Sequence, residues 1–347
     1  MRLRFIKCHG SGNDFPLIDA RDLALTDTQW AVVARALSDR GGPVGSDGLL
    51  LLTGDAATGE RPGMRMFNPD GSEAETCLNG LRCTARLAFE VGGQAEMMMH
   101  LKTSTADVRR VDPIAPGVVT VETRVGPVST RSRDVGLTHG VDHVVFATIP
   151  GLPSLRRFTA VAMPNPHLIS FVDTVDEEEL VALGDWCESA PPLIPGRANV
   201  SFVELRGRDL YVRTYERGVG LTNSCGSAMA ASTFAAALNG RVAFDRWLTV
   251  FNRGGMVGAM ASAPHGPSAD PAAGASASVP ANMVAIRGNA TFEFDAEVEV
   301  DLDTGALGAF HIVNRRDDEV LAWTDAVAAL STVDQPRTGQ SRSWTSE

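Results

Sequence analysis

The chain has 347 residues, of which 44% are hydrophobic and 21% charged, so a packed core is expected and a wholly disordered chain is excluded. Its net charge of −11 argues against nucleic acid or an anionic membrane as the main partner. The first residues lack the apolar stretch of a signal peptide, and no run of about 18 apolar residues occurs, so we expect a soluble, cytoplasmic protein.

The first half of the chain is predicted to combine short strands with two helices. Apolar patterning indicates strands at 3–6, 17–20, 49–52 and 64–67, and helices at 28–37 and 79–91. A glycine-rich turn, HGSGNDF, joins the first two strands, and a turn cluster, NPDGS, precedes the second helix. More strands are expected up to Val125.

The second half repeats this order of elements. Strands are expected at 158–163, 168–172, 200–205 and 210–215, and helices at 177–183 and 228–238. Cys77 and Cys225 are 148 positions apart, and Asn13 and Asn165 are 152 apart. Two pairs of matching residues that are separated by nearly the same number of positions predict an internal duplication, with a cleft between the two halves.

These observations predict an N-terminal lobe over 1–126, completed by a strand at about 290–302, and a C-terminal lobe over 127–289. Residues 261–282 are rich in Ala, Ser, Gly and Pro, which favours a flexible surface insertion. The remaining 303–347 form a C-terminal extension in which the strand rhythm is lost, and we expect it to be partly disordered.

A cysteine stands directly before the predicted start of each central helix, in CLNG from Cys77 and in CGS from Cys225. The free N–H groups and the positive dipole end at a helix N-terminus lower the pKa of a thiol and bind carboxylates. One such cysteine is more often a small buried hydrophobe. Two at duplicated positions would bring a base and an acid to opposite faces of one carbon, which suits inversion of an amino-acid α-carbon.

The sequence contains two other combinations of residues that could be catalytic. Cys225 with His167 could form a cysteine-hydrolase pair, but Cys77 would then have no role. His139 and His143 stand four apart without the glutamate of an H-E-x-x-H metal motif, so a solvated loop is expected there. No C-x-x-C occurs either, and no metal site is predicted.

Cofactor motifs are also weak. The stretch GVG at 218–220 begins like a dinucleotide fingerprint, but Asn223 occupies the third glycine position. Only Lys7 and Lys102 are lysines, so a Schiff-base cofactor such as pyridoxal phosphate has two possible attachment points. The other three cysteines have no repeated partner, and burial is expected for Cys8, Cys83 and Cys187.

Taken jointly, several motifs resemble the diaminopimelate epimerase family. They lie in family order between residues 3 and 302: HGSGNDF (9–15), FNPDGSE (67–73), CLNGLRC (77–83), NPH (165–167), RANV (197–200), and YERG (215–218) leading to CGS (225–227). The resemblance implies an α+β fold of two pseudo-symmetric lobes. In each lobe a mixed or antiparallel, barrel-like sheet is wrapped around a central helix, and the active site lies in the cleft between the lobes.

The resemblance further implies a cofactor-free isomerase that interconverts LL- and meso-diaminopimelate for lysine and peptidoglycan precursor synthesis, working as a cytoplasmic homodimer. Cys77 and Cys225 would be the acid/base thiols, tuned by His167 and Glu216. The substrate-binding residues would be Asn13, Asn68, Asn165, Asn199 and Arg217 at the distal end, Glu216 at the reacting ammonium, and the backbone N–H groups of Leu78, Asn79, Gly226 and Ser227 at the α-carboxylate.

The chain departs from the family pattern at five positions, which are Gly48, Leu78, Pro164, Leu221 and Ala228. An alternative therefore keeps the mechanism and changes the substrate, as in a racemase of histidine or proline. A third hypothesis is a binding protein that kept the cleft and lost turnover because Leu78 blocks it. The chain retains Arg217, for which an amino acid with one carboxylate would offer no second acidic group, and this favours diaminopimelate.

Overall fold

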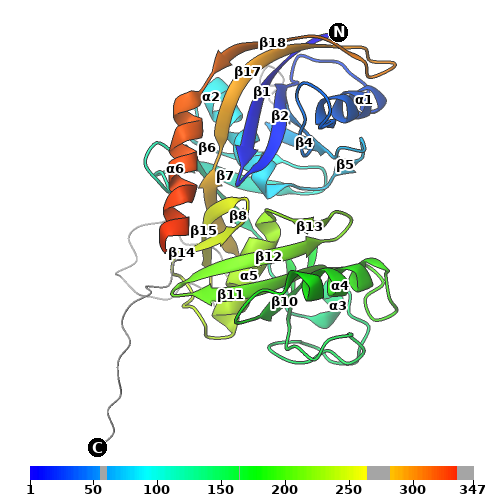
Figure 1. The fold of residues 1–347 in the computed structure, drawn as a ribbon, viewed down its shortest axis with the longest axis vertical. Coiled ribbons are helices and arrows are strands. Elements are labelled where there is room, and N and C mark those ends of the chain that lie inside the picture. The colour runs from blue at the N-terminus through cyan, green and yellow to red at the C-terminus, as the bar shows by residue number, and fades with distance from the viewer. Residues whose placement is uncertain (55–60, 164, 264–281, 334–347) are drawn as a thin grey trace, which may run out of the picture.

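The computed structural model describes residues 1–54, 61–163, 165–263 and 282–333. The chain forms two lobes, each a curved sheet around one central helix, and Figure 1 shows them one above the other. This arrangement confirms the two-lobed α+β fold that the sequence predicts.

The upper lobe in Figure 1 is formed mainly by the first third of the chain. It contains β1 (Arg2–Gly10), β2 (Asn13–Asp19), α1 (Asp27–Ser38), β3 (Leu49–Thr53), β4 (Gly63–Phe67), β5 (Glu73–Ala74), α2 (Leu78–Gly92), β6 (Glu96–His100), β7 (Thr105–Val111), β8 (Thr120–Val125), β17 (Thr291–Val300) and β18 (Leu307–Arg315). The late strand β17 pairs antiparallel with β1, so the chain returns to complete this lobe.

The lower lobe is formed by the middle of the chain. It contains α3 (Ser132–Val135), β9 (Thr159–Met163), β10 (Asn165–Phe171), α4 (Glu177–Glu188), β11 (Asn199–Arg206), β12 (Asp209–Glu216), β13 (Gly220–Thr222), α5 (Gly226–Leu238), β14 (Leu248–Asn252), β15 (Gly255–Ala261) and β16 (Val284–Asn289). Strand β16 pairs antiparallel with β8, which joins the sheets of the two lobes.

The strand pairings demonstrate the duplication. In the first lobe β1–β2 is antiparallel, β2–β3 parallel, β3–β4 antiparallel, β4–β6 parallel, and β6–β7 and β7–β8 antiparallel. The strands from β9 to β16 repeat this series without a change. Helices α1 and α4 occupy matching places, as do α2 and α5, so the two cysteine-headed helices are structural equivalents.

Both central helices are enclosed by their sheets, and a single apolar cluster surrounds them. Small residues make this possible in α5, where Ala230, Ala231, Ala235 and Ala236 are fully buried and let the strands approach closely. Separate clusters lie beneath α1 and beneath α3 and α4, on the outer faces of the sheets. The packing of α2 and α5 inside their sheets therefore holds the N-terminus of each helix in a defined position.

The extension after Asp303 differs from the sequence expectation, because 307–333 form regular structure. Strand β18 pairs antiparallel with β17, and α6 (Asp317–Val333) packs across both lobes at the left of Figure 1. Trp323 of α6 is buried against Val118 and Met256, and Glu319 forms an ion pair with Arg86 of α2. Trp323, Ala326, Val327 and Leu330 form an apolar stripe at helical spacing on the buried face of α6, so the sequence carried a signal for this helix that the sequence prediction missed.

Two further expectations fall wholly or partly outside the described ranges. Most of the insertion, 264–281, and the end of the tail, 334–347, are not described, while Ala261 closes β15. Within the described part of the chain, no helix is long and apolar enough to cross a membrane.

Candidate active site

Each of the two cysteines is the N-cap residue of its central helix. Cys77 has extended backbone angles and its Sγ accepts a hydrogen bond from the Gly80 N–H at 3.4 Å. Cys225 has the same backbone conformation at the start of α5, where its side chain makes no capping bond and contacts Ser227 Oγ at 3.5 Å. Both sulfur atoms therefore lie at the positive end of a helix dipole.

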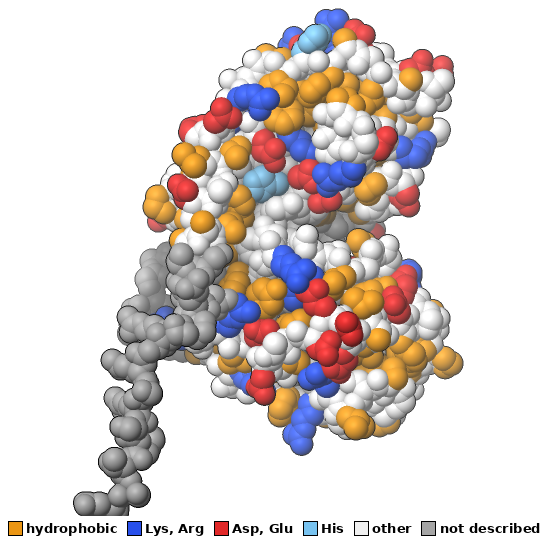
Figure 2. Space-filling model, viewed as in Figure 1, with side chains coloured by type: hydrophobic (Ala, Val, Ile, Leu, Met, Phe, Trp, Pro, Cys, Tyr) orange, Lys and Arg blue, Asp and Glu red, His pale blue; other side chains and the backbone are white. Residues whose placement is uncertain are grey.

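The two helix N-termini are in direct contact across the lobe junction. A Cβ built on Gly226 would lie 2.9 Å from the Cβ of Leu78, so the residues that follow the two cysteines touch each other. The side-chain amide of Asn79 donates to Ser224 Oγ at 3.3 Å, which joins the start of α2 to the residue before Cys225. The outline of the molecule narrows at this junction in Figure 2. The fold thus brings the duplicated cysteines into one site.

The two thiols lie in different electrostatic surroundings. Burial raises the pKa of Cys77 to about 11; nearby Glu216 adds to this rise, whereas the Gly80 N–H and the Arg82 cation oppose it. Burial also raises the pKa of Cys225 well above its usual range, and Glu216, which hydrogen-bonds this thiol, raises it further. Among the described residues no cation is a main influence on the pKa of Cys225, whereas Arg82 lowers that of Cys77, so the thiolate form is easier to reach at Cys77.

Glu216 at the end of β12 connects the two thiols. Its Oε1 accepts a hydrogen bond from Thr222 Oγ1 at 2.6 Å, and burial raises the pKa of its carboxyl group. Glu216 raises the pKa of Cys77 as well as that of Cys225, so its carboxyl group lies close enough to act on both thiols.

The C-terminal lobe supplies a second group of predicted residues. Asn165 donates from Nδ2 to Ser227 Oγ at 3.3 Å, and its Oδ1 lies 3.1 Å from Nε2 of fully buried His167. Burial lowers the pKa of His167 to about 3, with a further contribution from Arg217, so the ring is neutral. The other ring nitrogen of His167, Nδ1, has no hydrogen-bond partner in the described part of the chain.

Asn199 and Arg217 are linked to this group through the sheet. His167 and Asn199 are register partners on the parallel strands β10 and β11. Asn199 Oδ1 accepts from the backbone N–H of Arg217 at 2.8 Å, and the exposed Arg217 guanidinium donates to the Gly196 carbonyl. A guanidinium at the edge of the site suits a distal carboxylate of a ligand.

The N-terminal lobe supplies Asn13 and Asn79 next to Cys77. Asn13 Oδ1 lies 3.8 Å from Cys77 Sγ and 3.4 Å from Asn79 Nδ2. Asn68, by contrast, bonds Ser72 of its own turn, and no contact joins it to the other predicted site residues in the described ranges. The fold thus groups the predicted residues around the two cysteines, apart from Asn68.

The departures from the family pattern have local structural reasons at two positions. Gly48 has φ +153°, and a Cβ there would lie 2.4 Å from the Phe67 carbonyl oxygen, so no side chain fits. Leu78 fills the space that a Cβ on Gly226 would need. Leu221 packs against the core of the C-terminal lobe, Ala228 is fully buried in α5, and Pro164 lies outside the described residues.

Sequence reasoning missed two residues that contact the site. Arg82 is fully buried one turn into α2 and donates to Asn79 Oδ1, and Asp47 accepts from Asn13 Nδ2 at 2.6 Å. Arg82 stands within the CLNGLRC motif, so its position beside Cys77 on the helix was a usable signal. Nothing in the pattern around Asp47 marks it as a neighbour of Asn13, because only the fold brings β2 and the start of β3 together.

The alternative chemistries gain no support from the geometry. His167 bonds Asn165, and no hydrogen bond joins it to Cys225 among the described residues. His143 is exposed and bonds Thr130, as expected for a solvated loop, whereas His139 is half-buried and its Nε2 is buried without a hydrogen-bond partner in the described part of the chain, which differs from that expectation. Across residues 1–54, 61–163, 165–263 and 282–333, no group of three or more His, Cys, Asp or Glu side chains could hold a metal ion. The predicted burial of Cys8, Cys83 and Cys187 is confirmed.

These features define a duplicated, two-lobed α+β protein in which two cysteine-capped helices meet end to end. A family model described as diaminopimelate epimerase matches the chain twice, at residues 5–111 and 159–265, once in each half. The chain belongs to the diaminopimelate epimerase family.

Curated relatives agree with this assignment. A diaminopimelate epimerase of Clostridium acetobutylicum is 36% identical over 304 residues, covering 87% of each chain. One from Ligilactobacillus salivarius is 39% identical over 269 residues, covering 74% of this chain and 82% of its own. Among solved structures, a phenazine biosynthesis protein of the PhzF family from Bacillus anthracis has a TM-score of 0.59 and 15% identity, covering 86% of this chain and 100% of its own, which is a likeness of fold.

Proposed function

We propose that this protein is a diaminopimelate epimerase that inverts one α-carbon of LL-2,6-diaminopimelate to give the meso form, with Cys77 and Cys225 as the acid/base pair and no cofactor. The observation that carries the proposal is the contact between the two cysteine-capped helix N-termini, Leu78 against Gly226. The family membership and the small-molecule amino-acid substrate it implies support the same reaction.

In the proposed mechanism one cysteine acts as a thiolate and the other as a thiol. The thiolate removes the α-proton, forming an S–H bond while the C–H electron pair remains on the α-carbon. The opposite thiol then donates its proton to the other face of that carbon and becomes the thiolate. The configuration is inverted, the sum of protons is unchanged, and the reverse reaction exchanges the two roles.

The carbanion intermediate needs strong electrostatic stabilisation because no electron sink is invoked. We assign this task to the free N–H groups at the starts of α2 and α5, those of Leu78, Asn79, Gly226 and Ser227, which would bind the α-carboxylate. Glu216 would pair with the reacting ammonium group. The buried surroundings of both cysteines strengthen each of these interactions by excluding water.

Recognition of the distal amino-acid end is assigned to Asn13, Asn68, Asn165, Asn199 and Arg217. A substrate lacking a second carboxylate would leave the Arg217 guanidinium without an acidic partner. This is why we favour diaminopimelate over a single-ended amino acid such as histidine or proline. We also propose that the protein works as a homodimer, which light scattering on purified protein tests.

The decisive experiment is exchange of the substrate α-hydrogen with solvent. Purified protein in D₂O is incubated with LL-diaminopimelate, and deuterium incorporation and meso product are followed by NMR and chiral chromatography. We expect both to appear together. Racemisation of proline or histidine without any reaction of diaminopimelate would contradict the proposed substrate, and binding without exchange would indicate a protein that has lost turnover.

A further inference from the structure

A chain of side-chain hydrogen bonds runs past Cys77 from a buried cation to a carboxylate. Arg82 donates to Asn79 Oδ1 at 3.0 Å, Asn79 Nδ2 donates to Asn13 Oδ1 at 3.4 Å, and Asn13 Nδ2 donates to Asp47 Oδ2 at 2.6 Å. The chain connects helix α2, the start of β2 and the segment before β3. Cys77 Sγ lies 3.8 Å from the oxygen of the central amide, Asn13 Oδ1.

The groups at the two ends of this hydrogen-bond chain fix which atom donates and which accepts in every bond between them. A guanidinium only donates hydrogen bonds and an ionised carboxylate only accepts them. The Asn79 oxygen must therefore face Arg82, and the Asn13 nitrogen must face Asp47. In consequence the Asn13 oxygen, and not its NH₂ group, faces Cys77. Amide orientation is often ambiguous, but here the chemistry of the end groups settles it.

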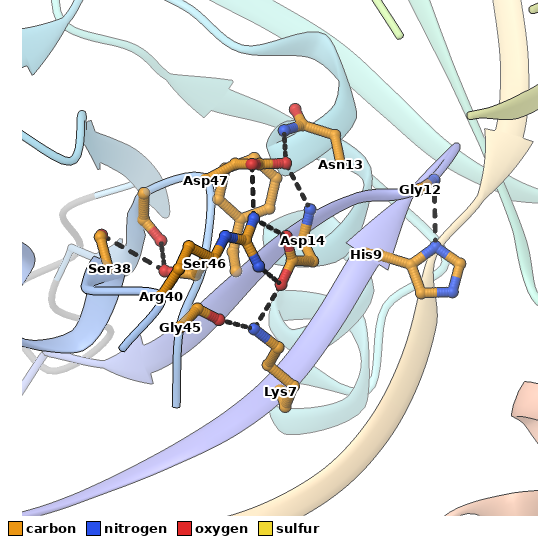
Figure 3. A network of polar contacts seen from close by, with 12 residues as sticks. Lys7, His9, Gly12, Asn13, Asp14, Ser38, Arg40, Gly45, Ser46 and Asp47 are labelled. Carbon is orange, nitrogen blue, oxygen red and sulfur yellow. Dashed lines mark hydrogen bonds and ion pairs between the residues drawn. The ribbon is translucent and has the colours of Figure 1, made fainter. Parts of the chain in front are cut away.

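Further hydrogen bonds and ion pairs hold the two end residues of this hydrogen-bond chain, Arg82 and Asp47, in place. All four hydrogen-bond acceptors of Arg82 are uncharged, and its guanidinium is fully buried. At the other end Arg40 bridges Asp47 and Asp14, with 2.6 Å bonds to a carboxylate oxygen of each, and Lys7 bonds Asp14 from beneath. Figure 3 shows Asn13 and Asp47 pointing toward one another beside this cluster.

We propose that Asp47 is a positioning residue: it fixes the Asn13 amide so that a carbonyl oxygen faces the Cys77 thiol. An acceptor there stabilises the S–H form and orients its proton, which keeps Cys77 able to act as the proton donor. A rotated amide would present NH₂ and stabilise the thiolate instead. The inference rests on the proposed function for its catalytic meaning, whereas the amide orientation itself is independent of the substrate.

Other charges act on Cys77 and must be separated from this effect. Arg82, on the same helix as Cys77, lowers the pKa of this thiol, whereas Glu216 on β12 raises it. Behind Asn13 lies a cluster of two acids and two bases, which are Asp14, Asp47, Lys7 and Arg40. Removing Asp47 changes the charge of this cluster as well as the amide orientation, so the test needs a variant that changes the charge alone.

The test measures the rate at which iodoacetamide alkylates Cys77 as a function of pH in Asp47→Asn. Cleavage after arginine places Cys77 and Cys225 in different peptides, so mass spectrometry follows both in one sample. Because the amide is free to rotate in the variant, we expect a fall of about one unit in the apparent pKa of Cys77, and about tenfold faster alkylation near neutral pH. Cys225, which makes no hydrogen bond to Asn13 among the described residues, serves as the internal control. Asp47 also raises the pKa of Glu216, which acts on both thiols, so an effect passed on through Glu216 appears at Cys225 as well as at Cys77.

Two further variants separate orientation from charge. Asp14→Asn removes a carboxylate from the same Arg40 cluster without touching Asn13 Nδ2, and we expect less than a twofold change. The double variant Asn13→Asp/Asp47→Asn keeps the net charge, reverses the donor and acceptor of the pair, and again presents an acceptor to Cys77. Because this acceptor is now a carboxylate 3.8 Å from the thiol, the alkylation rate should fall from that of Asp47→Asn to the wild-type value or below it. Circular dichroism establishes that each variant is folded.

Equal effects of Asp47→Asn and Asp14→Asn on Cys77 would overturn the proposal, because charge alone would then explain them. So would an unchanged ratio of Cys77 to Cys225 alkylation in a folded Asp47→Asn protein. Neither readout uses a substrate, so the outcome is independent of whether wild-type protein epimerises diaminopimelate. If it does, Asp47→Asn should lower kcat about tenfold, with less effect on KM, in the direction in which Cys77 donates the proton, as expected when proton donation rather than binding is impaired.

Discussion

The N-termini of α2 and α5 occupy equivalent places in the two halves of the molecule, yet they differ in chemistry. At α2, Cys77 is followed by Leu78 and, five positions on, by the buried cation Arg82. At α5, Cys225 is followed by Gly226, and alanine occupies the place that corresponds to Arg82. The carboxyl group of Glu216 hydrogen-bonds only the second cysteine among the two.

This difference shows how a duplicated scaffold serves an asymmetric task. Two equal thiols in equal surroundings would share one proton without preference. Arg82 lowers the pKa of Cys77, and Glu216 raises the pKa of both thiols while hydrogen-bonding Cys225. Under the proposed function this difference would make Cys77 the initial base and Cys225 the initial acid. The symmetry of the fold places the two groups, and the departures from symmetry give them different roles.

The largest expected effect comes from removing either thiol. Cys77→Ala and Cys225→Ala should each reduce epimerisation by a thousandfold or more, on the order of what general acid–base catalysis contributes at each step. Chiral chromatography of diaminopimelate measures the loss, and circular dichroism establishes that the fold is kept. Cys187→Ala, which removes a buried thiol from α4, is the control and should keep its activity. Activity retained by one of the site variants would mean that the two halves are not both required.

Helix α6 breaks the pseudo-symmetry, since no other helix in the described ranges corresponds to it. Trp323→Ala should lower the free energy of unfolding by about 3 kcal/mol, because a buried indole beside Met256 and Gly255 is removed. Urea denaturation measures the change. Leu321→Ala, at a position 60% exposed on the same helix, should change stability by less than about 0.5 kcal/mol. Equal losses for the two would contradict the anchoring role of Trp323.

The Leu78–Gly226 contact predicts a smaller effect. Gly226→Ala places a Cβ 2.9 Å from the Leu78 Cβ, so we expect a loss of about 1–3 kcal/mol in unfolding free energy. The loss should shrink when Leu78→Gly is introduced together with it, which a double-mutant cycle measures. Gly92→Ala, where a Cβ meets open space, should not be destabilising. An additive cycle would show that the two residues do not compete for space.

Two histidines that are buried in the described part of the chain, His9 in the first half and His167 in the second, predict the smallest effect. Burial lowers the pKa of His9 to about 4 and that of His167 to about 3. The unfolded chain takes up these protons at about pH 6.5, so each contribution is complete above that pH and is lost as the pH falls toward the native pKa. Between pH 7.5 and 5.5 we expect each histidine to cost about 1–2 kcal/mol of unfolding free energy.

Urea denaturation at several pH values, on His9→Asn, His167→Asn and wild type, tests this dependence. Each variant should show a flatter decline between neutral and mildly acidic pH than the wild type. His100→Asn, at an exposed position, is the matched control and should follow the wild-type curve. Parallel curves for all four proteins would mean that the buried histidines are not the source of the acid sensitivity.

Most elements of the fold could be read from the sequence. Apolar spacing predicted β1 to β4, β9 to β12 and β17 and the helices α1, α2, α4 and α5, and the repeated positions of Cys77 and Cys225 predicted the duplication. Apolar spacing placed no strand at β14, β15 or β16 and no helix at α3. Helix α6 was missed although Trp323, Ala326, Val327 and Leu330 recur at helical spacing, whereas the partners that hold the helix, Met256 and Arg86, are distant in the chain and follow only from the fold. The same holds for Asp47, whose partner Asn13 is 34 positions away in the chain.

The sequence by itself determined the two-lobed plan and the position of each cysteine at a helix start, because local patterning and capping act over a few residues. Only the tertiary structure decided that Leu78 meets Gly226, that Arg82 is buried without an acidic partner among the described residues, and that Asp47 orients Asn13. These relations depend on packing between segments distant in the chain, and packing is set by the whole core rather than by any one motif.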